Sequence, residues 1–214
     1  TPKPSSAASD VYKRQNQASQ IPNITPDQTA ALNKLVELNK ISQPIMVKTF
    51  RGPGNGIPTA TATKVTLYKS WNNNPNLILP EMIRFAKGSG TLEDRFQILQ
   101  YDSRANMTHV TTVNGPRTRY EYDVYDNVKA KIDNYTGSDS VPVEAPNLPV
   151  DFQPGTPSPC TFGSMYPEGM VTWYYYDTLT RLLRRTVDRN CRSTYYEYDT
   201  LMRLKQIKDQ DGNI

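Results

Sequence analysis

The sequence has 214 residues, a formal net charge of +4 and an apolar fraction of 36%, with 14 tyrosines against 5 phenylalanines and 2 tryptophans. Lys3, Lys13, Arg14 and Asp10 leave a surplus of two positive charges near the start, so the remainder is close to neutral and no strong polyanion-binding field is implied. No run approaches the ~20 consecutive apolar residues of a membrane span, and no signal peptide is visible. The tyrosine bias favours β structure, where a ring can bury its body and keep its hydroxyl wet.

Residues 1–15 are expected to lie outside any fold. Residues 10–15 look like the translation of a transposon mosaic end used in sequencing libraries, which makes the stretch adaptor-derived. The alternative is an ordinary disordered basic leader. Both interpretations exclude it from the folded chain, and the first also suggests that the chain is an assembled fragment whose natural start is unknown.

Residues 16–93 form a pre-repeat segment that begins with one short helix. Thr25 is a suitable N-cap, Pro26 suits the first helical position, and Gln28 completes a capping box. The helix is expected to end before Pro44. Its apolar stripe consists of Leu32, Leu35, Val36 and Leu38.

Two strand-like stretches follow the helix. Residues 45–50 alternate enough to form a strand, and residues 51–56 form a loop by turn chemistry. Residues 61–71 predict a second strand that ends at residues 72–75. One face of it carries Val65, Leu67 and Lys69, and the other carries Thr66, Tyr68 and Ser70.

A Tyr-x-Tyr-Asp signature recurs in the second half of the chain. Asp102 and Asp123 are 21 residues apart, and Asp177 and Asp199 are 22 residues apart. A fixed period of this length indicates a repeat architecture, which usually builds surfaces and scaffolds. The motif residues are Tyr101 and Asp102 in a weaker first copy, then Tyr120, Tyr122 and Asp123, Tyr174, Tyr176 and Asp177, and Tyr196, Tyr198 and Asp199.

Each copy predicts a β-hairpin. The two aromatic positions are two residues apart and share one face of a strand. An apolar residue stands five places after each aspartate, and thirteen places after it stands a residue that tolerates left-handed backbone angles. The first set is Met107, Val128, Leu182 and Leu204; the second is Gly115, Asn190 and Gly212, with Gly137 displaced by one.

The repeats form two pairs. Residues 94–137 hold the first pair, and residues 169–214 hold a second pair that is truncated at the C-terminus. Residues 138–168 between them are proline-rich and lack periodic apolar positions, so we expect an extended insertion loop. The predicted fold is therefore mainly β: consecutive antiparallel hairpins in a curved or spiralling sheet, with one short N-terminal helix.

These repeats resemble the bacterial RHS/YD-repeat family. The resemblance covers roughly residues 94–214 and is clearest in residues 174–182 and 196–204, followed by the turn at 209–212. It implies a long sheet of hairpins that in some members closes into a shell around a C-terminal toxic domain, while other members sit at cell surfaces with adhesive or carbohydrate-binding roles proposed. The resemblance therefore implies a secreted or cell-surface protein of the polymorphic-toxin type.

The chain departs from the family pattern in its turns. The family places glycine three residues after the aspartate, where a left-handed backbone costs other residues on the order of 1 kcal/mol. Either these turns adopt another type or the repeats are degenerate. The family's self-cleavage residues and toxin domain have no match here. The positions in question are occupied by Ala105, Asp126, Thr180 and Met202.

No catalytic constellation stands out. His109 is the single histidine and is interpreted as a half-exposed strand residue. The recurrence of the aspartates favours Asx-type capping of turns over paired catalytic acids. Cys160 and Cys191 could pair, and a metal site is not expected. An arginine-rich stretch near Trp173 is interleaved with acidic residues, which disfavours nucleic-acid binding.

The tyrosines are the best candidates for binding. Rings two apart on one face could hold sugar rings, or they could be a core between layers or a shell lining. We therefore expect a non-enzymatic scaffold without cofactor or metal, whose partners are neighbouring repeats and either cell-surface glycans or an enclosed toxin domain. The candidate glycan-binding residues are Tyr174, Tyr176, Tyr196 and Tyr198.

Overall fold

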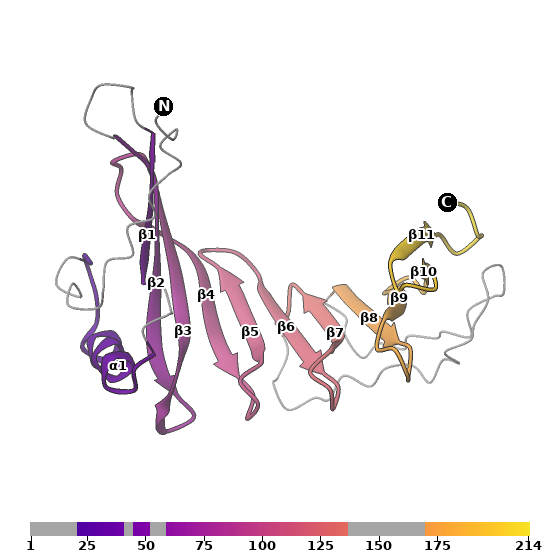
Figure 1. The fold of residues 1–214 in the computed structure, drawn as a ribbon, viewed down its shortest axis with the longest axis horizontal. Helices are drawn as coiled ribbons and strands as arrows, with labels where there is room; N and C mark the ends of the chain where they lie inside the picture. The colour runs from indigo at the N-terminus through magenta and orange to yellow at the C-terminus, as the bar shows by residue number, and fades with distance from the viewer. Residues whose placement is uncertain (1–20, 41–44, 52–58, 137–169) are drawn as a thin grey trace, which may run out of the picture. The chain divides into compact units, whose positions relative to one another are not determined.

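The computed structural model describes residues 21–40, 45–51, 59–136 and 170–214, which form one helix and eleven strands (Figure 1). The chain divides into two compact units, Thr1–Gly115 and Pro116–Ile214. The predicted leader, the insertion and residues 52–56 of the predicted loop lie outside the described residues. The prediction of a mainly β fold of consecutive antiparallel hairpins with one short helix is confirmed.

The first unit contains the helix and five strands. Strands adjacent in the chain pair antiparallel, from β1 through β5. The elements are α1 (Pro26–Glu37), β1 (Met46–Arg51), β2 (Thr59–Trp71), β3 (Asn74–Lys87), β4 (Glu93–Tyr101) and β5 (Met107–Thr112).

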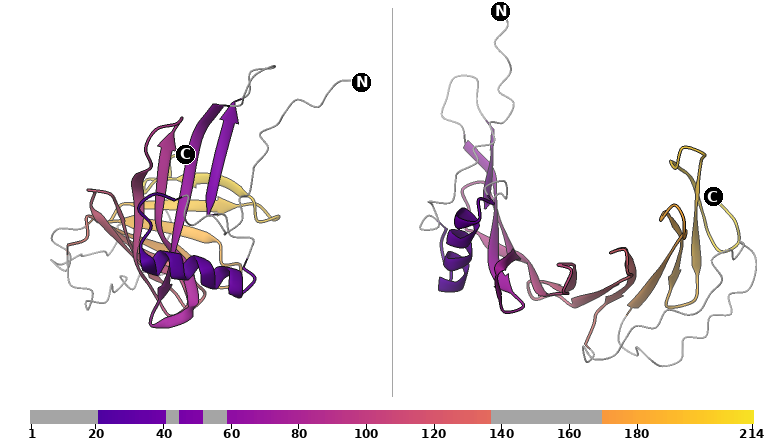
Figure 2. Two further views of the ribbon diagram at one scale, coloured as in Figure 1. Left: turned by 90° about the vertical axis from the view of Figure 1, so that its left-hand side faces the viewer. Right: turned by 60° about the horizontal axis from the view of Figure 1, so that its bottom comes forward.

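The helix begins as its sequence predicts. The Thr25 side chain accepts a hydrogen bond from the Gln28 backbone N–H, and the Gln28 side chain accepts one from the Thr25 N–H, so the capping box is complete. The helix lies across one face of the sheet (Figure 2). The prediction for Val36 is wrong, because this residue is exposed while Ala31 joins Leu32 and Leu35 in the core.

The core of the first unit joins the helix to the long strands. Leu32 and Leu35 of α1 pack with Val65, Leu67 and Ile78. Tyr68 is also buried, although alternation places it on the face opposite Val65 and Leu67; the register shift at this point comes from one extra residue, Glu81, on β3.

Strand β3 was not predicted. Asn72 and Asn73 both have φ near 54°, as the central residues of a type I′ turn require, and the chain returns at once as β3. This strand contains Pro75 and Pro80, which weaken the sequence signal for a strand.

The second unit is a run of hairpins, in which each strand again pairs antiparallel with the next. Strands β7 and β8 pair directly, with Ile132 opposite Val171, although residues 134–169 separate them in sequence. The strands are β6 (Arg117–Tyr122), β7 (Val128–Asp133), β8 (Met170–Tyr176), β9 (Leu183–Asp188), β10 (Ser193–Tyr198) and β11 (Leu204–Lys208).

The buried face of the second unit combines apolar and cationic side chains. Ala130, Ile132, Tyr135, Val171 and Trp173 form its core cluster. Arg119 and Arg185 are buried at 8% and 2% exposure, on the side of this cluster, because Arg119 pairs with Ile132 and Arg185 pairs with Tyr175. Within the described residues, no helix is long and apolar enough to cross a membrane.

Candidate functional site: the repeated hairpin ends

The signature aspartates organise the turns that follow them. Asp123 is representative: its Oδ1 accepts hydrogen bonds from the backbone N–H groups of Tyr125 at 2.8 Å and Asn127 at 2.9 Å. The Asp123 N–H in turn donates to the Asn127 carbonyl at 2.9 Å. This is the Asx-type role expected from the sequence. The same pair of carboxylate contacts occurs in the turns that begin at Asp102, Asp188, Asp199 and Asp209.

These hydrogen bonds control the charge of the carboxylates. For Asp199, the bonds from Arg203 lower the pKa below its usual value. For Asp123, burial raises the pKa, but hydrogen bonds from Asn127 and Tyr125 outweigh it and the net shift is downward. In these two turns the hydrogen bonds therefore favour the ionised carboxylate.

In three repeats, the residue three places after the aspartate has a left-handed backbone although it is not glycine. Ala105, Asp126 and Met202 have φ of 69°, 65° and 61°. The sequence left open another turn type or degenerate repeats; in these three repeats the left-handed conformation is kept by a residue other than glycine, which corresponds to the second alternative.

The third repeat has a longer turn, which avoids a left-handed backbone at Thr180. Thr180 is β-branched and would bear the largest strain at positive φ. The turn is one residue longer: the Asp177 N–H donates to the Leu182 carbonyl at 2.9 Å, and Arg181 takes the left-handed conformation with φ of 61°. Thr180 instead donates its hydroxyl to Asp177 Oδ1 at 3.0 Å.

The structure corrects part of the prediction for the turns expected thirteen residues after each aspartate. Gly212 has the expected positive φ, but in the first and third repeats the left-handed residues are Asn114 and Cys191, each one place from the predicted Gly115 and Asn190. Gly115 is required for space, because a Cβ there would lie 1.9 Å from Thr112 Oγ1. Gly137 lies outside the described residues.

A β-bulge precedes the last signature tyrosine of every repeat. The register shifts directly before Tyr101, Tyr122, Tyr176 and Tyr198, and in each case the partner strand carries one extra residue. Alternation along a single strand cannot reveal a bulge, because it depends on the partner strand. The extra residues are Thr108, Lys129, Arg184 and Lys205.

The last signature tyrosine anchors its repeat to the preceding strand. The Tyr101 hydroxyl donates to the Pro80 carbonyl at 2.7 Å, and the Tyr176 hydroxyl donates to the Val128 carbonyl at 3.0 Å. Burial raises the pKa of Tyr176 to about 12, so its hydroxyl remains a donor above the pH at which an exposed tyrosine ionises.

The signature tyrosines of the second unit share the face opposite its core. Glu121 pairs with buried Ala130, and Tyr175 pairs with buried Arg185, so the flanking tyrosines point the other way. They are half-buried, so they are not a core between packed layers of the described residues. We call this set the tyrosine face: Tyr120, Tyr122, Tyr174, Tyr176, Tyr196 and Tyr198.

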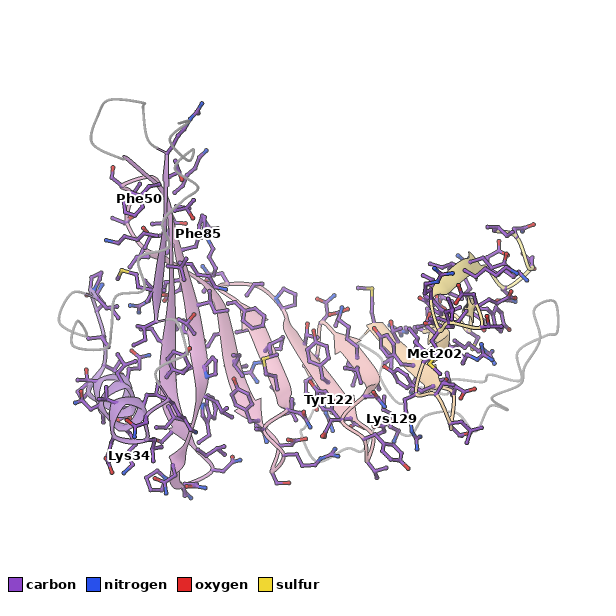
Figure 3. All side chains as sticks on the ribbon, viewed as in Figure 1. Lys34, Phe50, Phe85, Tyr122, Lys129 and Met202 are labelled. Carbon is purple, nitrogen blue, oxygen red and sulfur yellow. The ribbon has the colours of Figure 1, made fainter. Side chains whose placement is uncertain are left out.

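On the tyrosine face, strands that carry tyrosines alternate with strands that carry basic side chains. Its tyrosines stand on β6, β8 and β10, whose backbones are on the order of 10 Å apart. On the intervening strands, Lys131 pairs with Tyr120, and Lys129, Arg184 and Lys205 are the extra residues of the bulges. The tyrosines therefore stand on alternate strands; Figure 3 labels Tyr122 and Lys129 on the β6–β7 hairpin.

A cation–π contact joins two successive repeats of the second unit. The Arg181 guanidinium lies 3.4 Å from the centroid of the Tyr125 ring. Arg181 is the left-handed residue of the lengthened turn, and its charge also helps to lower the pKa of Asp123, after the hydrogen bonds. The extra residue of the third turn thus provides this contact.

The remaining candidates from the sequence are His109, the arginine-rich stretch and the two cysteines. His109 is 7% exposed, so the interpretation as a half-exposed residue is wrong; its Nδ1 lies 3.1 Å from Thr108 Oγ1. Of the arginine-rich stretch, Arg185 is buried. Cys191 is disulfide-bonded, and Cys160 lies outside the described residues. In the described part of the chain, no cluster of His, Cys, Asp or Glu could hold a metal ion.

Comparisons with known proteins find only distant similarity. No family model matches the chain, and neither does any curated protein. The solved structures that the chain matches include chains of the TcdB2-TccC3-TEV and TcdB2-TccC3-Cdc42 crystal structures, each at 10% identity and a TM-score of 0.39. The alignments cover 84% and 85% of this chain but 9% and 10% of those chains. At this level the similarity identifies neither family nor function.

Proposed function

We propose that this chain is a non-enzymatic structural segment of a secreted or cell-surface RHS/YD-repeat protein, in which its hairpins extend a β shell or scaffold. The observation that carries the proposal is the repeated hairpin end. The same combination of aspartate-centred turn, bulge and following strand is built at each signature copy, which fits a modular wall better than a single reaction centre.

Two features support the proposed extracellular location and the proposed pairing with further repeats. The disulfide of Cys191 suits an oxidising, extracellular compartment. Exposed apolar residues gather on the last hairpin, where a further repeat could cover them and become the partner of this segment. These residues are Leu201, Met202, Leu204 and Ile207. A toxin domain enclosed by the complete shell remains part of the same proposal.

Adding one further repeat after residue 214 tests the scaffold role. A copy of residues 193–214 fused to the full chain should raise the melting temperature of the second unit, because it pairs with β11 and buries the exposed apolar residues. A matched copy with prolines in both added strands cannot pair and should give no gain. A gain with neither copy, or an equal gain with both, would contradict the proposal.

A second candidate is a carbohydrate-binding or adhesive role for the tyrosine face. The observation in its favour is the half-exposed position of Tyr174, Tyr176, Tyr196 and Tyr198 on the face opposite the core. Glycan-array binding by the full chain should be lost when these four residues are changed to alanine. Tyr125→Ala, at an exposed turn tyrosine outside this face, is the matched control and should keep binding.

A further inference from the structure

The first unit contains a cavity that is separate from the tyrosine face. It has a volume of about 480 Å³ and lies between the start of α1 and the β2–β3 turn. This size falls within the range of sites for small ligands, but the hollow is open to solvent: Asp27, Ala30 and the turn residues are exposed, so a ligand would lie on a surface and would not be enclosed. The helix contributes Asp27 and Ala30, and the hairpin contributes Lys69, Ser70, Trp71 and residues 72–75.

The aromatic wall of the cavity is fixed in place. The Trp71 Nε1–H donates to the Leu79 carbonyl at 3.2 Å, and the Trp71 ring meets Tyr101 edge-on, with centroids 4.9 Å apart. Tyr101 is held in turn by its hydrogen bond to the Pro80 carbonyl. A ring that is already positioned costs little entropy when a ligand packs on it.

The polar wall is also built on a rigid turn. Asn72 and Asn73 hold the left-handed angles of the type I′ turn, and Asn72 Nδ2 donates to the Asp102 carbonyl at 3.4 Å. Asn74 Oδ1 accepts from the Asn76 N–H at 3.0 Å. The amide groups beside Trp71 are thus carried by backbone whose conformation is set by the hairpin.

The lining combines donors and acceptors of both charge signs. Lys69 donates only, the Asp27 side chain contributes acceptor oxygens, and the Ser70 hydroxyl and Asn73 amide can do both. The Lys69 ammonium lies 5.4 Å from the centroid of the Trp71 ring and 3.7 Å from Glu81 Oε1. An anionic ligand would meet Asp27 and a cationic one would meet Lys69, whereas hydroxyl groups can bond to all four.

We propose that this cavity binds a neutral saccharide, with a sugar ring packed against Trp71 and its hydroxyl groups bonded to the Asp27, Lys69 and Asn73 side chains. The apolar C–H face of a pyranose matches an aromatic surface, and its hydroxyls match the mixed lining. The site belongs to the first unit and is independent of both proposals made for the repeats.

The test is a titration of the full chain with neutral and charged sugars. Trp173→Phe leaves Trp71 as the only tryptophan fluorophore, and N-acetylglucosamine, galactose, maltose and cellobiose are compared with glucuronate and glucosamine. At least one neutral sugar should change the Trp71 emission saturably. No response to any neutral sugar, or a tighter response to a charged one, would overturn the proposal.

Two variants locate the site, with binding measured by saturation-transfer NMR. Asn73→Gly keeps a favourable Asn-Gly turn and should weaken binding severalfold without changing the circular dichroism spectrum. Trp71→Ala should weaken it about tenfold or more. Tyr174→Ala is the matched control on the tyrosine face and should bind as the parent does. Unchanged binding by both cavity variants, or loss in the control, would contradict this site while leaving the scaffold proposal intact.

Discussion

The two units bury their sheets in different ways. In the first, a helix covers the sheet, and the core is aliphatic, with Leu35 and Leu67 fully buried. In the second, the described core lies on one face of a run of short hairpins, and the Arg185 guanidinium is 5.9 Å from the Tyr175 ring and 5.4 Å from the Tyr195 ring. One hairpin plan can therefore be stabilised by hydrophobic packing or by buried cation–π and hydrogen-bond networks.

Breaking the aliphatic core should have the largest effect. Leu35→Ala removes a fully buried side chain and should lower the free energy of unfolding of the first unit by about 3 kcal/mol or more. Urea unfolding followed by Trp71 fluorescence in the Trp173→Phe background measures this loss. The exposed neighbour Val36 is the matched control, and Val36→Ala should change stability by less than about 0.5 kcal/mol. Equal effects of the two variants would contradict the assigned helix face.

The buried arginine of the second unit should come next. Arg185 donates from Nε at 3.0 Å and Nη2 at 2.7 Å to Ser193 Oγ, so Arg185→Ala should cost about 2–3 kcal/mol through lost packing and lost hydrogen bonds. Arg184→Ala, at the exposed neighbour, should cost less than about 0.5 kcal/mol. Trp173 fluorescence in the Trp71→Phe background reports the transition.

A methionine at the same position separates the contribution of packing from that of the charge and its hydrogen bonds. Arg185→Met keeps the aliphatic stem and removes the charge, and replacement of a buried ion by an apolar side chain of similar volume is often neutral. If packing dominates, Arg185→Met should retain most of the stability that Arg185→Ala loses. If both variants lose the same amount, the hydrogen bonds and cation–π contacts carry the core instead.

The aspartate turns should contribute a smaller amount each. Asp123→Ala removes two hydrogen bonds to backbone N–H groups and should cost about 1–2 kcal/mol. Val124→Ala, at an exposed residue of the same turn, is the control and should be nearly neutral. Chemical unfolding of the second unit at pH 7 measures both variants.

The pH dependence of this loss identifies its origin. The folded pKa of Asp123 lies below its unfolded value of about 3.9, so its ionised form stabilises the fold above that pH and this contribution is lost as the pH falls through the folded pKa. The difference between the Asp123→Ala variant and the parent should therefore shrink below about pH 4. A difference that stays constant down to pH 2 would show that the carboxylate charge does not matter.

Local signals predicted local structure in both units. The Thr25 capping box and the Asx-type role of Asp123 each depend on residues within four positions, and both are present in the structure. In contrast, β3 escaped prediction because Pro75 and Pro80 lie within it. The bulges, and the burial of Arg185 and His109, depend on partner strands. A single strand read alone therefore suggests the wrong environment for such residues.

The last prediction concerns the turns in which glycine is missing. Met202 has φ of 61°, so Met202→Gly relieves left-handed strain at the cost of greater freedom in the unfolded chain, and should raise the stability of the second unit by up to about 1 kcal/mol. Thr180 stands at the same distance from its aspartate, but its turn has passed the left-handed position to Arg181. Thr180→Gly should therefore give no gain and should instead lose the hydroxyl bond to Asp177. The melting temperatures of both variants test this explanation. A higher melting temperature for Thr180→Gly would show that the third turn can adopt the shorter form, and that Thr180 is not the reason for the extra residue.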